Sequence, residues 1–216
     1  MKQITLLRSL FIFLLIMQIS NNCFSQEAKE FFNSQDAKVT WLGIDFSEVR
    51  VMGDVGATPG EMKDRYFTSI NDVVVNESEK YNLSKAFRKL NVSSDLSAVS
   101  KNNSKIDGDK LKTFKTEDLN RFTPEMIENV VKNYDFRDRK GWGIVFIMEG
   151  LNKTGPVASM YVTIINIDKK KVVMTKRITG KARGFGFRNF WAGAIYDALK
   201  DIDKSYYDKW KSEKMK

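Results

Sequence analysis

Three strand-like runs follow one another in the C-terminal half of the chain, and their spacing constrains the fold more than any other feature. Residues 142–148, 158–167 and 171–179 are rich in β-branched and aromatic side chains, which are enriched in strands. The segments between them, 152–156 and 168–170, have room only for tight turns, whereas parallel strands need a crossover of a dozen or more residues. The sequence therefore predicts an antiparallel three-stranded unit.

Helical signals lie on both sides of this unit. Residues 59–76 and 124–134 each follow a capping Thr, begin with Pro and carry apolar residues at helical spacing, a pattern typical of helix starts. The segment from Asn189 to Trp210 is the clearest amphipathic helix, and 39–46 predicts a first strand. From this order we expect an α+β fold: a single domain with a mixed, mostly antiparallel sheet, helices packed on one of its faces, and a long C-terminal amphipathic helix.

The amino terminus has the parts of a secretory signal peptide. Lys2 and Arg8 flank the start of an apolar run at 10–17, which is shorter than the roughly 20 apolar residues that span a bilayer. Cys23 and Ser25 then fit a small-x-small cleavage rule. We expect cleavage between Ser25 and the following Gln, while lipidation of Cys23 is the alternative.

This interpretation divides the chain into a signal peptide (1–25), a flexible segment (26–37) and a single α/β domain (38–216), exported to the periplasm or the cell surface. Cleavage removes the only cysteine, so the mature chain forms neither a disulfide nor a thiolate metal site. No later apolar run is long enough to span a membrane, so any membrane contact is made at its surface.

The chain contains no histidine, which excludes Ser-His-Asp and Cys-His catalysis and histidine-based metal sites. We expect no cofactor, no metal and, on balance, no enzymatic activity. The alternative is a carboxylate-dependent glycan hydrolase, for which four acids near predicted strand ends are candidates: Asp45, Glu48, Asp54 and Glu149. Asp107 and Asp109 lack the spacing of an EF-hand calcium loop and are expected to form a solvated turn.

Positive charge is concentrated in one segment. Residues 169–188 contain eight basic and no acidic residues. Without Lys2 and Arg8 the formal charge falls from +9 to +7, so the rest of the mature chain is close to neutral. A local cluster of one sign attracts anions more strongly than the same charge spread evenly.

The end of this segment, 180–188, brings two glycines and two phenylalanines directly before a helix, where backbone amides and the helix dipole favour an anion. The candidate anion- or partner-binding residues are Lys176, Arg177, Lys181, Arg183, Gly184, Gly186, Arg188 and Asn189. The purely structural alternative is a strand-to-helix turn made by glycines, with lysines that discourage edge pairing. The segment matches neither a Walker loop nor the dinucleotide fingerprint, since Asn189 occupies the place of the third glycine.

Two segments, 41–47 (WLGIDFS) and 184–193 (GFGFRNFWAG), together with the signal ending in FSQ, resemble uncharacterised exported proteins of Bacteroidota. The resemblance implies an envelope location and no particular activity. The order of elements also looks like the α/β domains of envelope-assembly proteins of the Tol and curli secretion systems, a likeness of topology that does not settle function.

The sequence thus predicts a non-catalytic, exported binding or assembly module that contacts an anionic envelope component or an acidic protein through its basic hairpin and Gly-Phe loop. Nucleic acid is not expected as a partner, because the chain is expected to leave the cytoplasm. Besides the hydrolase, a structural subunit of an envelope complex remains an alternative; it would expose a large apolar patch when isolated.

Overall fold

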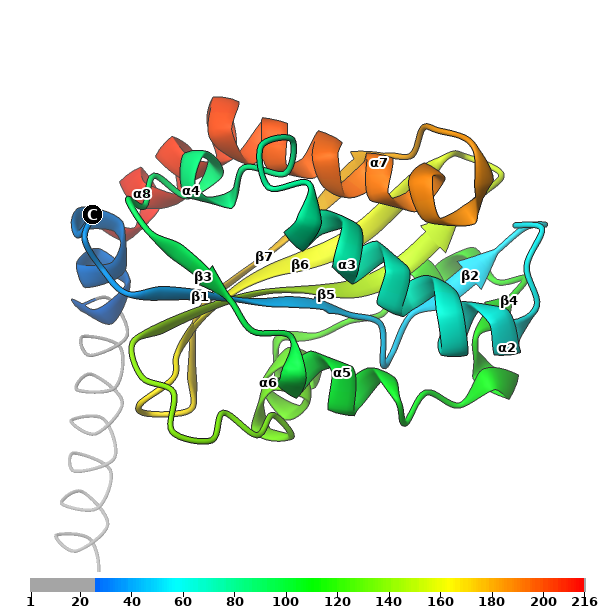
Figure 1. The fold of residues 1–216 in the computed structure, drawn as a ribbon, viewed down its shortest axis with the longest axis horizontal. Coiled ribbons are helices and arrows are strands. Elements are labelled where there is room, and N and C mark those ends of the chain that lie inside the picture. Colours follow the sequence, from blue (N-terminus) through cyan, green and yellow to red (C-terminus); the bar gives the residue numbers. More distant parts are fainter. Residues whose placement is uncertain (1–25, 216) are drawn as a thin grey trace, which may run out of the picture.

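The structure is a computed structural model that describes residues 26–215. The expected signal peptide, including Cys23, lies outside the described residues. The domain is α/β, built on a central sheet of seven strands: β1 (Val39–Asp45), β2 (Arg50–Met52), β3 (Val92–Ser94), β4 (Lys112–Thr113), β5 (Trp142–Asn152), β6 (Val157–Asn166) and β7 (Lys171–Lys181) (Figure 1).

The N-terminal part of the sheet is parallel. β1 pairs with β3 and β5, and β2 pairs with β4 and β5, all in parallel. Since β1 and β2 lie one after the other along the same side of β5, they form one interrupted strand. Only the β5–β6 and β6–β7 pairs are antiparallel, which confirms the predicted three-stranded unit.

The prediction of an α+β fold with a mostly antiparallel sheet is therefore wrong, because the central sheet is mostly parallel. Helical segments between β1 and β5 return the chain to the same end of the sheet, as parallel pairing requires. β3 has three residues and β4 has two, too few for an alternating apolar pattern to reveal them.

Two long helices contain a single π-helical turn each. The first comprises α2 (Pro59–Glu61), η1 (Met62–Tyr66) and α3 (Phe67–Asn76), and the second comprises α7 (Gly186–Asp201), η4 (Ile202–Tyr206) and α8 (Tyr207–Met215). The shorter helices are α4 (Leu83–Ala86), α5 (Ser97–Asn103), η2 (Gly108–Lys110), η3 (Thr116–Asn120) and α6 (Pro124–Lys132). The predicted capping box is present: the Thr58 hydroxyl accepts from the Glu61 amide, and the Glu61 carboxylate accepts from the Thr58 amide.

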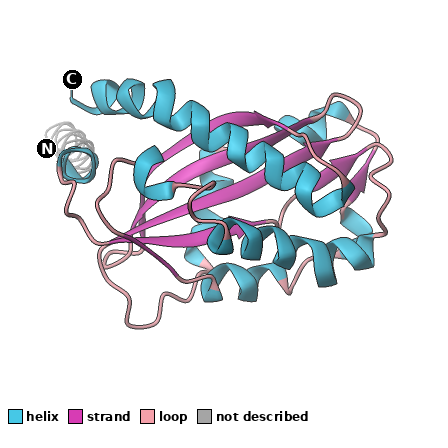
Figure 2. Cartoon of the chain, turned by 45° about the horizontal axis from the view of Figure 1, so that its top comes forward, coloured by secondary structure: helices cyan, strands magenta, loops and turns pink. Residues whose placement is uncertain are grey.

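Helices cover both faces of the sheet, and not one face as the sequence suggested (Figure 2). On one face, α3 and α7 pack on alternate side chains of β5, such as Ile144 and Phe146. On the other face, α5 and α6 pack on Val145 and Ile147. β5 is buried on both sides, which explains its continuous apolar sequence.

Residues 26–33 are helical, although the sequence suggested a flexible segment. Phe31 and Phe32 from this helix are buried in the main core, and Phe32 packs edge-on against Tyr207 of α8. The buried Lys89 ammonium donates to the carbonyls of Phe31 and Ser34 at the end of the helix. These contacts fix the segment to the domain.

α7 lies unusually close to β7. A Cβ atom at Gly180 of β7 would come 2.0 Å from the Ala194 carbonyl oxygen, and one at Gly193 of α7 would come 2.1 Å from the Arg183 carbonyl oxygen. Only glycine allows this approach. The middle of α7 is thus held directly against the end of β7 and the residues that follow it.

Candidate functional site

The loops that follow the C-terminal ends of the parallel strands gather at one end of the molecule, opposite the end that holds residues 26–33 and the C terminus (Figure 1). One row of paired residues crosses the sheet here, in the order Thr113, Met52, Asn152, Val157 and Lys181. We define the loop end by the four segments next to this row, 53–58, 112–116, 152–156 and 181–188. In α/β proteins, the strand ends of this side are the usual place for binding sites.

The loop end is strongly basic. It contains one acidic residue, Asp54, and its basic residues are Lys112, Lys115, Lys153, Lys181, Arg183 and Arg188. Asp54 accepts a hydrogen bond from the backbone of Gly56 and so belongs to its own turn. The basic side chains thus outnumber the acidic ones at this end of the sheet.

The residues of the Gly-Phe loop are all at the loop end. Gly184 and Gly186 have φ values of +127° and +74°, which lie in the left-handed region that favours glycine. The backbone turns sharply here, and α7 begins at Gly186, three residues earlier than Asn189, the expected start. Arg188 is exposed and donates to the side chain of the neighbouring Asn189 at 3.0 Å.

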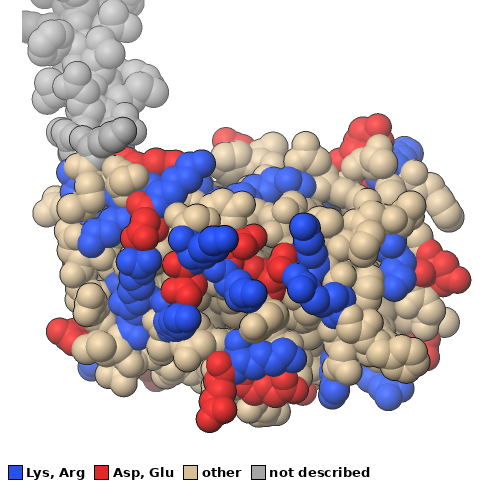
Figure 3. Space-filling view, turned by 90° about the horizontal axis from the view of Figure 1, so that it is seen from above, with Lys and Arg blue, Asp and Glu red and all other residues tan. Residues whose placement is uncertain are grey.

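Three of the predicted basic residues form ion pairs with acidic residues of the chain: Lys176, Arg177 and Arg183. Arg183 pairs with Asp197 of α7, and the second oxygen of Asp197 accepts from the backbone of Lys181 at 2.9 Å. Lys176 pairs with Glu213 of α8 at 2.6 Å. Figure 3 views the molecule from above its orientation in Figure 1, and on this face basic and acidic side chains are interleaved rather than segregated.

Arg177 is bound on the other face of the sheet. Its guanidinium donates to Glu149 at 2.7 Å and to the Leu119 carbonyl at 2.9 Å. Successive residues of a strand point to opposite faces, so Lys176 and Arg177 cannot form one basic surface. The structure brings residues 181–189 together at the loop end and places these two side chains along the middle of β7.

Two phenylalanines at the loop end are almost fully exposed. Phe185, between the two glycines, is 95% exposed, and Phe114, directly after β4, is 97% exposed. Phe187 instead turns inward, where it stacks on Tyr66 with ring centroids 4.8 Å apart. Phe114 is not among the residues predicted from the sequence, because it lies in a segment without clear periodicity; its neighbours Lys112 and Lys115 were the available signal.

A pocket of about 380 Å³ opens beside the Gly-Phe loop. Its walls are largely aromatic and include Phe187, Phe190 and Trp191, with Val55 and Lys153 from two neighbouring loops. The Lys153 ammonium lies 3.5 Å from the centroid of the Phe190 ring, a cation–π contact. Three of the four segments of the loop end, 53–58, 152–156 and 181–188, therefore share one pocket.

A larger pocket, of about 440 Å³, lies between residues 79–86 and the α7–η4 helix. Four lysines and four acids line it. Lys85 is already paired there with Asp203 at 3.1 Å. With charges of both signs in equal number, this pocket offers no excess charge to an ionic ligand.

The carboxylates considered for hydrolysis are part of the scaffold. Both Asp45 and Glu149 are fully buried. Asp45 accepts from the Ser47 amide, the Asn102 side chain and the Tyr134 hydroxyl at 2.7, 3.0 and 2.8 Å. Burial and the neighbouring carboxylate raise the pKa of Tyr134 well above its usual value, so this hydroxyl remains a donor.

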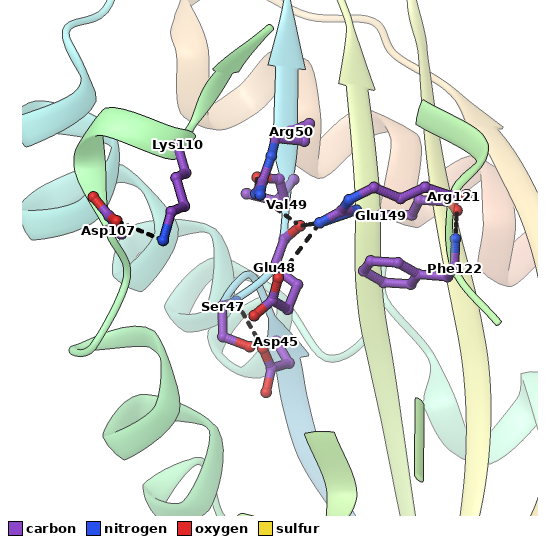
Figure 4. A network of polar contacts seen from close by, with 10 residues as sticks. All are labelled: Asp45, Ser47, Glu48, Val49, Arg50, Asp107, Lys110, Arg121, Phe122 and Glu149. Atoms are coloured by element: carbon purple, nitrogen blue, oxygen red, sulfur yellow. Dashed lines mark hydrogen bonds and ion pairs between the residues drawn. The ribbon is translucent and has the colours of Figure 1, made fainter. Parts of the chain in front are cut away.

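Glu149 of β5 and Glu48, between β1 and β2, both bind the segment that follows η3 (Figure 4). Glu149 accepts from the Phe122 amide at 2.8 Å as well as from Arg177. Burial lowers the pKa of Arg121. Its guanidinium donates to the Glu48 carbonyl. Neither Asp45 nor Glu149 lines either of the two pockets above, and this geometry gives the hydrolase alternative no support.

The Asp107 side chain binds groups of its own turn. Asp107 accepts from the Asp109 amide at 3.1 Å and pairs with Lys110 at 3.0 Å, so it caps η2. Among residues 26–215, no cluster of three or more His, Cys, Asp or Glu side chains is arranged to hold a metal ion.

No protein-family model, curated protein or solved structure matches this chain. Within the described part of the chain, no helix has the length and apolar content needed to cross a membrane.

Proposed function

We propose that the protein is a non-catalytic binding module of the cell envelope and that it contacts an anionic component through its loop end. The observation that carries the proposal is the exposure of Phe185, 95%, on a basic loop between Lys181 and Arg188. A folded protein gains nothing in stability from a phenylalanine that it leaves in water. The exposed position of Phe185 is better explained by contact with the surface of a binding partner.

Charge supports an anionic partner. Lys115, Lys181 and Arg188 are exposed, and no acidic side chain is paired with them among the ion pairs of the described residues. The proposed contact surface is smaller than the basic hairpin expected from the sequence, because Lys176 and Arg177 are bound within the protein. The exported location remains part of the proposal and rests on the predicted signal peptide.

The start of α7 adds to the positive potential. Its N-cap residue, Phe185, provides no side-chain hydrogen bond, and no acid lies in the first turn. The first amides of a helix without a side-chain cap carry partial positive charge. An anion at the loop end would therefore meet backbone donors as well as cations.

The test is retention of the chain from Gln26 onward on immobilised dextran sulfate, eluted with rising salt. The variant Lys115→Gln, Lys181→Gln and Arg188→Gln removes three charges from the loop end. The matched control removes three exposed charges elsewhere, Lys132→Gln, Lys140→Gln and Lys209→Gln. We expect the loop-end variant to elute at clearly lower salt than both the wild type and the control, since each contact that is lost reduces the number of counterions released on binding.

Equal elution of the two triple variants would refute the proposal, because retention would then depend only on the net charge. Circular dichroism confirms that each variant is folded. All six substituted side chains are exposed, so we expect their thermal unfolding to match that of the wild type within a few degrees.

A further inference from the structure

We infer that the anionic component is a lipid bilayer, and that Phe114 and Phe185 are two wedges that enter its interface while the basic residues of the loop end contact lipid headgroups. This inference rests on the function proposed above. It adds a second contact residue, Phe114, that lies outside the basic hairpin. It also adds a commitment to one class of partner.

The two side chains differ from the other exposed apolar residues. Among the described residues, the large apolar side chains that are exposed are Phe114, Phe185, Leu90 and Met215, at 97%, 95%, 62% and 44%. Only the first two belong to the loop end. Single exposed apolar residues need no explanation, but two almost fully exposed aromatic rings on two loops of the same basic end do.

Each ring is held outward by the structure around it. Gly184 and Gly186 bend the backbone on both sides of Phe185, while Phe187, in the first turn of α7, is buried and stacks on Tyr66 of η1. Next to Phe114, the Thr113 side chain is buried, and its hydroxyl donates to Asp118 and accepts from the Lys115 amide. Both phenylalanines therefore stand on anchored turns.

The spacing of the wedges favours a bilayer over a protein partner. Phe114 and Phe185 belong to two different loops, which leave the sheet at Thr113 and Lys181; these two residues stand at opposite ends of a row that crosses four strand spacings, or about 19 Å. A protein interface needs a continuous, well-packed apolar centre. Separate aromatic tips with polar residues and lysines between them suit a fluid interface instead.

The charges provide the other half of the attraction. Six basic residues and one acidic residue belong to the loop end; Arg183 is paired with Asp197, and the negative surface potential of an anionic membrane attracts the other five basic residues. Because the loop end lies opposite residues 26–33 (Figure 1), docking here leaves the N-terminal helix and α8 on the side that faces away from the bilayer.

The experiment uses the cysteine-free chain from Gln26 onward, with a single cysteine introduced as Phe114→Cys, Phe185→Cys or Leu90→Cys and labelled with an environment-sensitive dye. Vesicles contain equal parts of phosphatidylglycerol and phosphatidylethanolamine, or phosphatidylcholine alone. We expect the dye at positions 114 and 185 to shift to the blue with anionic vesicles only, and the dye at position 90 to stay unchanged. Equal shifts at all three positions, or none at 114 and 185, would overturn the inference.

Co-sedimentation with the same vesicles tests the energetics. Phe114→Ser and Phe185→Ser are each expected to weaken binding by about tenfold, since burying one aromatic side chain contributes roughly this much. Leu90→Ser is the control and should bind as the wild type does.

The outcomes separate the inference from the proposed function. If dextran sulfate retention depends on the loop-end charges but vesicle binding is absent or unaffected by the phenylalanines, the bilayer is not the partner, and an acidic protein takes its place. If neither probe responds to the loop-end charges, both the inference and the proposed function fail.

Discussion

Phe185→Ser should make the protein more stable while it weakens contact with the partner. α7 begins at Gly186, and Phe185 is its N-cap, with φ −110° and ψ 137° and no side-chain cap. Serine is favoured at this position, because its hydroxyl accepts from an amide of the first turn, here that of Phe187 or Arg188. Such a cap stabilises by about 1 kcal/mol relative to an uncapped residue.

The substitution loses almost nothing in return, since the ring is 95% exposed. For a domain of this size, 1 kcal/mol corresponds to a rise of about 2–4 °C in the melting temperature. Thermal unfolding followed by circular dichroism measures this change, and vesicle binding is measured on the same sample. Phe185→Ala is the matched control, because it removes the ring without adding a cap: binding should fall and the melting temperature should stay unchanged.

A lower melting temperature for Phe185→Ser would refute this reasoning, because it would mean that the ring contributes packing to the folded protein. Unchanged vesicle binding with a higher melting temperature would keep the argument about the cap and remove the functional role of the ring. The two measurements therefore test separate steps of the argument.

Three further predictions concern the scaffold. Asn71→Ala leaves the buried N–H of Ile44 without its partner at 2.7 Å, while the Ile44 carbonyl keeps the Asn103 side chain as a donor, and it should lower the free energy of unfolding by about 1–3 kcal/mol in urea titrations; a smaller loss would mean that water replaces the amide. Arg177→Met leaves the buried Glu149 unpaired and should cost about 3–5 kcal/mol, of which the double variant with Glu149→Leu recovers part; no recovery would contradict the buried-charge explanation. Burial lowers the pKa of Lys89 from 10.5 to about 8, so between these values the unfolded state holds more protons and stability should rise with pH, a rise that Lys89→Met should lack when urea unfolding is measured between pH 8 and 10.

Local signals were sufficient to predict most of the helices and the antiparallel unit. The caps at Thr58 and Thr123 are both present, since each depends on residues only three positions apart. The pairing of β1 with β3 and β5 depends on contacts between distant segments. At the carboxyl end of β1, where β3 no longer pairs with it, the side chains of Asn71 and Asn103 bind the free backbone groups of Ile44 and Phe46, an arrangement without any local pattern.

For the same reason, the sequence predicted only part of the candidate site. The Gly-Phe loop could be recognised because its glycines, phenylalanines and basic residues are adjacent in the sequence. The acids that bind the basic residues of β7 are not: Glu213 is 37 residues from Lys176, Glu149 is 28 residues from Arg177, and both reach them only in the folded chain. A count of charges along the sequence therefore overestimated the basic surface.

Ion pairing along β7 determines where positive charge remains available. Glu213 and Glu149 hold charges on opposite faces of the middle of the strand, while Asp197 binds both the backbone of Lys181 and the side chain of Arg183 at its end. These pairs attach α8, the β5 side of the sheet and α7 to β7, so they contribute to the scaffold rather than to a partner. Lys181 and Arg188, at the end of β7 and the start of α7, remain exposed at the loop end, near Phe185, a phenylalanine that the core does not use. Because stability and contact depend on different residues, substitutions at the loop end can abolish binding and leave the fold intact, which is the property that a binding surface, and not a packing surface, should have.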